Sequence, residues 1–510
     1  MSRRPPTFAL LAAGAVLAGG AFLRLAAFDL VPFKIDGVTA ILTTRFWFGH
    51  GLPQFGQMSG TGVIMPPGFI YVLYPLVRLT SSALAVTLYV AVFNIAALVP
   101  IYLLGREAGG RRAGFWAAAL AAFHPWLIFY SRTIWPQCVF PFFSAWFLLV
   151  VVRCTRVPRS RGIFWAGPLL SLIWQIHYSG YSVLAFFLFW FAVAAVRRRV
   201  RWPSALAGFL AGLFLLVPHL FFLFRSGFAP LRQTFGGRIG AAAPFPANFA
   251  EIAVSWWNNL FAGGLGWNFQ SGQFGMAPLR GTPLGLERGW LEPLGLAATF
   301  LVFVLFLAGV ALQRSGRTPA LPLDRDPVAW LALMAVIPLL VYPLRGIRIP
   351  PWSFLAGLPA ALAVAGRGLA ALGGSIRNRK PWPALPALVG VPIVISGAAI
   401  HLAFLAHVGE RGGTGGMYGL TYRVQEAAAE RLIGEGIALD RIDAGLTDGA
   451  GFSIFYLHDY LAGRLPARPP LTARRARLID RLRFPGWNCI PGEESPLSAP
   501  GPVLICVSPE

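Results

Sequence analysis

The sequence is poor in charge, and above all in acids. Charged residues make up 12% of its 510 residues, with 20 aspartates and glutamates against 43 lysines and arginines, whereas 56% of the chain is hydrophobic. Apolar runs of about the 20 residues that cross a bilayer recur along the chain. This pattern predicts a polytopic α-helical membrane protein. The first run, residues 8–28, is longer than the apolar part of a signal peptide, so we expect a retained first helix.

Lysine is nearly absent, because Lys34 and Lys380 are the only two and arginine supplies almost all of the net charge of +23. Such a surplus can indicate a nucleic-acid partner, but the arginines stand in short clusters between apolar runs. That arrangement is typical of the cytoplasmic loops of membrane proteins. We therefore expect anionic membrane lipid, and no nucleic acid, beside the clusters at residues 105–112, 153–161, 197–201, 313–325 and 366–380.

Placing the N-terminus and every cluster in the cytoplasm orders the apolar runs into about eleven spans. The segments expected outside are the loops 29–82 and 226–289, the turns near 131–135, 177 and 345–349, and the tail from residue 408. The spans are expected near residues 8–28, 83–104, 113–130, 136–153, 162–176, 179–196, 203–225, 290–312, 327–344, 350–366 and 384–407.

The sequence divides at residue 408. Residues 1–407 form the predicted transmembrane domain, and the aromatic and aliphatic stretch 69–77 in its first external loop suits an interfacial helix. Residues 408–510 are much more polar, with a helical pattern and a strand-like end, and predict a small external α/β domain. Cys489 and Cys506 lie in this domain, where an oxidising compartment permits a disulfide.

The predicted spans contain no aspartate, glutamate or lysine deep inside, and no internal repeat stands out. A transporter of lipid-linked glycans, an alternative with the same number of spans, is expected to show acids or broken helices near the middle of the membrane. The sequence therefore favours a site at one face of the membrane. Among the few acids outside, Asp36 has no acidic neighbour, and a solvated loop aspartate is its simplest interpretation.

Five motifs follow one another along residues 20–190: "LRLAAF", "KIDG", "GLP", "MPPGFIYVLYPL" and "IYLLGREAGGRRAGFWAAALAAFHPWLIFYSR". Their order resembles that of the GT-C superfamily of polyprenyl-phosphate-dependent glycosyltransferases, which includes protein O-mannosyltransferases and the lipid A aminoarabinose transferase. The resemblance implies an inverting enzyme of the bacterial inner membrane. Such an enzyme transfers a sugar from a polyprenyl-phosphate donor to a glycan, lipid or protein acceptor at the periplasmic face.

By its position, Asp36 matches the acid that takes the acceptor's hydroxyl proton in this family. Some relatives also use the acid to bind a divalent metal, Mg²⁺ or Mn²⁺. Gly37 stands where many members have glutamate, which leaves metal binding and a two-carboxylate mechanism open. A non-catalytic scaffold of the same fold is a further interpretation of this difference.

A transferase of this type also needs cations near the membrane surface to hold the departing phosphate. Arg345 and Arg348 resemble the family's basic motif between two spans, and a guanidinium fork suits a phosphate; interfacial arginines that only extend toward water are the alternative. His177 and Tyr178 lie where relatives often carry a lysine or histidine, although a buried histidine with one hydrogen-bond partner fits as well. Arg132 is the last candidate, but the acid that often follows it in the family is missing.

The long loop 226–289 contains Trp256, Trp257 and Asn258. Paired tryptophans are typical of an aromatic belt at the membrane surface. Sugars also stack on tryptophan rings, so these three residues are candidates for substrate binding.

Overall fold

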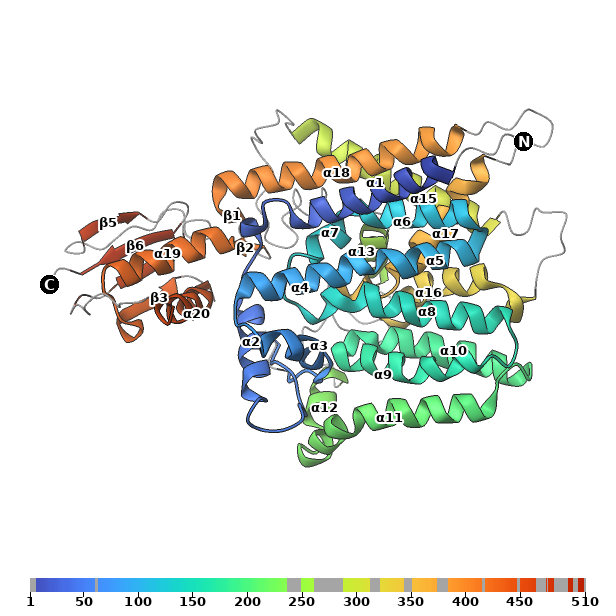
Figure 1. Ribbon diagram of the computed structural model, residues 1–510, viewed down its shortest axis with the longest axis horizontal. Coiled ribbons are helices and arrows are strands. Elements are labelled where there is room, and N and C mark those ends of the chain that lie inside the picture. Colours follow the sequence, from blue (N-terminus) through green and yellow to red (C-terminus); the bar gives the residue numbers. More distant parts are fainter. Residues whose placement is uncertain are drawn as a thin grey trace.

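The computed structural model is a bundle of helices lying side by side, with a small sheet domain at one end and the N-terminus at the other (Figure 1). The all-α membrane fold with an added α/β domain is therefore confirmed. The structure describes residues 6–59, 63–235, 249–260, 288–311, 322–343, 351–373, 384–414, 418–446, 450–464, 474, 476–480, 494–498 and 503–508.

Each predicted span coincides with one helix or with two consecutive helical segments. Within the described residues, six stretches are long and apolar enough to cross a membrane, and shorter apolar helices lie among them. The chain is thus a multi-pass membrane protein. The helices of the bundle are α1 (Pro6–Leu25), α4 (Ala83–Ala96) with α5 (Leu98–Gly109), α6 (Arg111–Ala122) with α7 (Pro125–Tyr130), η2 (Pro136–Val139) with α8 (Phe140–Arg156), η3 (Arg161–Trp165) with α9 (Ala166–Ile176), η4 (Tyr178–Gly180) with α10 (Tyr181–Val196), α11 (Trp202–Arg225), α15 (Arg288–Ala311), α16 (Pro327–Val341), η7 (Pro351–Phe354) with α17 (Leu358–Leu372), and α18 (Leu385–Arg411).

The two long loops form short helices. The first loop contains η1 (Phe28–Leu30), α2 (Ile35–Phe46) and α3 (Gly68–Val77), and the second contains α12 (Ala229–Phe235) and α13 (Phe249–Leu260). Helix α3 covers the stretch predicted as an interfacial helix. It packs on the end of α9, where a Cβ atom at Gly68 would lie 2.6 Å from the carbonyl carbon of Gln175. Only glycine permits this approach, which ties the first loop to the bundle.

The arginine clusters meet at one end of the bundle. Arg156 forms a 3.0 Å ion pair with Glu107, and the backbone N–H of Arg159 donates to the carbonyl oxygen of Arg199 over 2.7 Å. Arg199 in turn lies 3.2 Å from Asp324, and both side chains are largely buried. Four clusters that are distant in sequence therefore form one basic end.

Glycines set the closest helix contacts. A Cβ atom on Gly208 of α11 would lie 2.2 Å from the carbonyl oxygen of Phe164, and one on Gly167 would lie 2.0 Å from the carbonyl oxygen of Gly208. One turn further along α11, a Cβ atom on Gly212 would lie 2.7 Å from the carbonyl oxygen of Gly167. Small residues four apart let membrane helices approach to backbone contact.

Gly208→Leu is expected to destabilise this contact, because no side-chain carbon fits against the Phe164 carbonyl. Overpacking of a tight site costs about 1–3 kcal/mol and sometimes more, so the purified variant should melt at a lower temperature in detergent. Leu206→Phe enlarges a side chain that is 58% exposed on the same helix and should melt like the wild type. Equal melting temperatures for all three proteins would contradict the packing.

The C-terminal domain combines two helices with a mixed sheet. After the short hairpin β1 (Gly413–Thr414) and β2 (Gly419–Leu420), the described sheet has four strands in the order β3-β4-β6-β5, in which β3 pairs parallel with β4 and the other pairs are antiparallel. Cys506 is disulfide-bonded, and Cys489, its expected partner, lies outside the described residues. The elements are α19 (Tyr422–Gly434), η8 (Leu439–Arg441), β3 (Ile442–Leu446), α20 (Ala450–Ala462), β4 (Ala476–Asp480), β5 (Glu494–Ser498) and β6 (Val503–Val507).

Candidate active site

Asp36 lies in the first turn of α2, at the end of the bundle that carries the C-terminal domain (Figure 1). The indole Nε1–H of Trp135, in the turn between α7 and η2, donates to Asp36 Oδ2 over 2.8 Å. Burial raises the pKa of Asp36, while the Trp135 hydrogen bond and the charge of Lys34 act in the opposite direction. The helix N-terminus also favours the ionised carboxylate. Asp36 is thus a half-buried acid whose second oxygen has no hydrogen-bond donor among the described residues.

Lys34 precedes α2 and stands beside this carboxylate. Its Nζ lies 5.0 Å from the ring centroid of Trp135, the same indole that holds Asp36. Burial lowers the pKa of Lys34 to about 8, and the nearby Asp36 raises it. In the part of the chain that the structure describes, the ammonium has no hydrogen-bond acceptor or ion-pair partner. A half-buried cation without an acceptor is suited to an anionic ligand.

Aromatic rings extend the site toward the turns of the same end. The rings of Trp135 and Trp352 lie 5.1 Å apart between centroids. Trp352 belongs to η7. The Tyr342 hydroxyl donates to the carbonyl oxygen of Ser353, the next residue of η7, over 2.8 Å. The same hydroxyl lies 3.3 Å from the carbonyl oxygen of Ser179. The turns at 131–135, 178–180 and 351–354 are therefore connected by these contacts, and the first of them contacts Asp36 through Trp135.

Comparison with solved structures identifies proteins of similar architecture. Neither a protein-family model nor a curated protein matches the sequence. ArnT from Cupriavidus metallidurans in the apo state is similar with a TM-score of 0.58 at 12% identity, over 99% of this chain and 98% of that one. The structure of ArnT bound to undecaprenyl phosphate gives a TM-score of 0.55 at the same identity and coverage. The apo oligosaccharyltransferase of Archaeoglobus fulgidus matches 92% of this chain and 62% of its own, with 13% identity and a TM-score of 0.47. The chain has the same overall fold as the two ArnT structures.

Arg345 and Arg348 lie outside the described residues. The nearest described residues are Pro343 and Pro351, and the adjacent Tyr342 and Trp352 belong to the surroundings of the site. The predicted contact of the two arginines with a donor phosphate stays a prediction.

His177 is the N-cap of η4, and Tyr178 is the first residue of that helix. The backbone N–H of Ser179 donates to His177 Nδ1 over 3.0 Å, so the half-buried imidazole caps η4. Tyr178 is 2% exposed and packs with Val63 and Met65 in a small cluster separate from the core that contains Trp135. Nothing in these contacts tests a role in donor binding.

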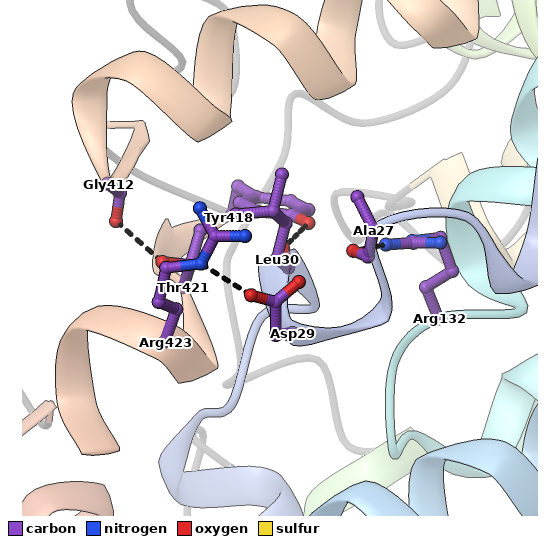
Figure 2. A network of polar contacts seen from close by, with 8 residues as sticks. All are labelled: Ala27, Asp29, Leu30, Arg132, Gly412, Tyr418, Thr421 and Arg423. Carbon is purple, nitrogen blue, oxygen red and sulfur yellow. Dashed lines mark hydrogen bonds and ion pairs between the residues drawn. The ribbon is translucent and has the colours of Figure 1, made fainter. Parts of the chain in front are cut away.

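The Arg132 guanidinium is bound to backbone carbonyls at the end of α1 and in the turn after it. Arg132 is 1% exposed, and its guanidinium donates to the carbonyl oxygens of Arg24 over 2.9 Å, Ala26 over 2.7 Å and Ala27 over 2.7 Å, the last of which Figure 2 shows. The end of a helix leaves such carbonyls without partners. Ala27 has left-handed backbone angles (φ 45°), which a non-glycine residue rarely adopts without support. We therefore assign Arg132 to holding the turn after α1.

The tryptophans of the second loop are packing residues in the described structure. Trp256 is 9% exposed, and its Nε1–H donates to the carbonyl oxygen of Ala335 in α16 over 2.7 Å. Trp257 is partly buried against the core of the bundle. The side chain of Asn258 lies outside the described residues. Substrate stacking on these residues remains untested.

A divalent metal would need several oxygen or nitrogen ligands around Asp36. Among the described residues, no group of three or more His, Cys, Asp or Glu side chains is placed to hold one. The groups that face Asp36 are the N–H of Trp135 and the cation of Lys34, which are a hydrogen-bond donor and a positive charge. The described donor set does not fit Mg²⁺ or Mn²⁺.

Two residues of this site, Lys34 and Trp135, were not predicted from the sequence. Lys34 was not predicted as a site residue, although it is one of only two lysines and lies two residues before Asp36. Trp135 was not predicted either, because its partner Asp36 is 99 residues away. The rarity of lysine was the available signal for the first, and no local signal existed for the second.

Proposed function

We propose that this protein is an inverting membrane glycosyltransferase. It takes a sugar from a polyprenyl-phosphate donor and transfers it to a hydroxyl-bearing acceptor at the periplasmic face of a bacterial inner membrane. The observation that carries the proposal is that a half-buried carboxylate, Asp36, and a cation, Lys34, which has no acceptor among the described residues, both contact Trp135. The fold that the chain shares with ArnT supports it, since the similar ArnT structure contains undecaprenyl phosphate.

The chemistry follows from the two charges. The acceptor oxygen attacks C1 of the sugar from the side opposite the phosphate, so the C1–O(phosphate) bond breaks and the configuration at C1 inverts. Asp36 accepts the acceptor's hydroxyl proton as that bond forms. The leaving polyprenyl phosphate carries the negative charge away, and Lys34 stabilises that charge in the transition state. A single displacement of this kind needs one base and one cationic group.

Arg345 and Arg348, which lie outside the described residues, are proposed to complete the phosphate site. Arg348→Ala should weaken donor use more than Arg348→Lys, because lysine keeps the charge and loses the guanidinium fork. A hydrogen bond to a charged group contributes about 1.5–3 kcal/mol, or about tenfold to a hundredfold in donor use. Wild-type transfer in both variants would leave Arg348 as an interfacial anchor.

The proposed reaction releases free polyprenyl phosphate whatever the sugar and the acceptor. The test is therefore to incubate the purified full chain in liposomes with undecaprenyl-phosphate sugars and a membrane extract as acceptor, and to measure released undecaprenyl phosphate by mass spectrometry. Release that depends on both the protein and the extract is expected. Absence of release across a panel of donor sugars, together with no binding of undecaprenyl phosphate in native mass spectrometry, would overturn the proposal.

A further inference from the structure

Residues 29–33 comprise the end of η1 and the link toward α2, and they lead directly to Lys34 and Asp36. The C-terminal domain holds this segment along its length. The backbone N–H of Tyr422 donates to the carbonyl oxygen of Val31 over 2.8 Å, and Pro32 pairs with Thr421 as an isolated antiparallel bridge. The segment therefore lies beside residues 418–425, which are about 390 positions later in the sequence.

Two further contacts flank this pairing. The Tyr418 hydroxyl donates to the carbonyl oxygen of Leu30, and Arg423 forms an ion pair with Asp29 (Figure 2). Tyr418 is 1% exposed, so its polar contact is inside the protein, whereas the Arg423 pair is exposed and contributes little stability. We call residues 418–425 the latch segment.

Gln425 is the member of the latch segment whose side chain is hydrogen-bonded to the residue before Lys34. Its side chain is completely buried, and its Nε2 donates both to the carbonyl oxygen of Phe33 over 2.8 Å and to that of Leu420 over 2.9 Å. Phe33 is the residue before Lys34, and its buried ring lies 5.7 Å from the ring of Tyr456 in α20. The backbone that enters α2 is thus fixed by the C-terminal domain.

The membrane bundle holds the same stretch from the other side. One turn, residues 131–135, supplies Arg132 to the carbonyls of Ala26 and Ala27, and Trp135 to the carboxylate of Asp36. Arg132 also interacts with the Tyr418 hydroxyl of the latch segment. The chain from Ala26 to Asp36 is therefore clamped between the bundle and the C-terminal domain.

We infer that the C-terminal domain positions Asp36 for catalysis, with Gln425 as the positioning residue that acts through Phe33. The inference rests on the proposed role of Asp36 in transfer. Without the Gln425 amide, the buried carbonyl oxygens of Phe33 and Leu420 lose a donor, and the start of α2 gains freedom to shift. A shift of about 1 Å at a catalytic group lowers rate by as much as about a hundredfold.

The experiment compares Gln425→Met with His458→Phe in the full chain. Methionine keeps the length of the side chain and removes both N–H donors. His458 is a matched control, because it is a buried polar residue of the same domain whose Nε2 lies 3.0 Å from the carbonyl oxygen of Ile437, within the domain. Hydrogen exchange of peptides covering residues 29–40 reports the position of the segment, and steady-state transfer reports catalysis.

For Gln425→Met we expect exchange at residues 33–38 to become about tenfold faster and kcat to fall about tenfold, with the donor KM within about twofold of wild type. His458→Phe should change neither quantity. Unchanged exchange in Gln425→Met, faster exchange with wild-type kcat, or an equal loss of kcat in both variants would each overturn the inference. If Asp36→Asn retains transfer, the proposed function fails instead, and the exchange measurement still decides whether the latch segment holds residues 29–33.

Discussion

Asp36→Asn is expected to lower transfer by about a hundredfold or more, since general-base catalysis typically contributes about 10²–10⁴-fold. Asparagine keeps the size of the side chain and an oxygen that accepts the Trp135 N–H, but it removes the basicity. The variant should therefore fold, insert and bind undecaprenyl phosphate like the wild type. Release of undecaprenyl phosphate from the donor and the melting temperature are measured on the same detergent preparation.

Two further variants make the result specific. Asp36→Glu should restore little transfer, because the added methylene moves the oxygen away from the acceptor. Asp440→Asn neutralises an exposed acid of the C-terminal domain and should leave transfer unchanged. Retained transfer in Asp36→Asn, or lost transfer with a much lower melting temperature, would remove Asp36 from the catalytic role.

Lys34→Met is expected to reduce kcat/KM for the donor by about tenfold to a hundredfold, the range for losing a hydrogen bond to a charged group. The ammonium has no hydrogen-bond acceptor among the described residues, so its removal there loses only the contact with the Trp135 ring and the attraction to Asp36. Lys34→Arg keeps the charge and should retain more activity than Lys34→Met. Equal activity of wild type and Lys34→Met would exclude Lys34 from the phosphate site.

The pH dependence of kcat/KM distinguishes the contribution of Asp36 from that of Lys34. Transfer needs ionised Asp36, whose pKa burial raises, so kcat/KM should increase with pH through a midpoint above that of an ordinary aspartate. It also needs protonated Lys34, whose pKa is lowered to about 8, so kcat/KM should fall as pH rises through about 8. Lys34→Arg should abolish the alkaline fall, because arginine stays protonated there. An unchanged alkaline fall in Lys34→Arg would assign it to another group.

Hydropathy alone was enough to locate the helices of the bundle. Each predicted span coincides with helical segments, from residues 8–28 on α1 to residues 384–407 on α18, because a bilayer requires a local property, about 20 consecutive apolar residues. The nearby sequence also predicts that Asp36 lies outside these helices. It likewise shows the polarity of the tail that forms the α/β domain. These features could be predicted without knowing which segments touch.

The partners of each side chain depended on contacts that no local pattern encodes. Arg132 matched a phosphate-binding pattern, yet its guanidinium holds carbonyls that lie 105–108 residues earlier in the chain. Trp256 matched a sugar-binding pattern, yet its indole N–H is used 79 residues away on α16. Arginine and tryptophan serve either purpose, and the contacts that each side chain makes with distant helices could not be derived from the sequence.

The surroundings of Asp36 were decided by tertiary structure alone. The residue itself is visible in the sequence as an isolated acid after the first apolar run, but Trp135 reaches it across 99 residues, and Gln425 fixes Phe33 across 392. A span is specified by the free energy of moving its own residues into lipid, which the sequence states directly. A site at the end of the bundle is specified by hydrogen bonds between segments that meet only after the helices have packed.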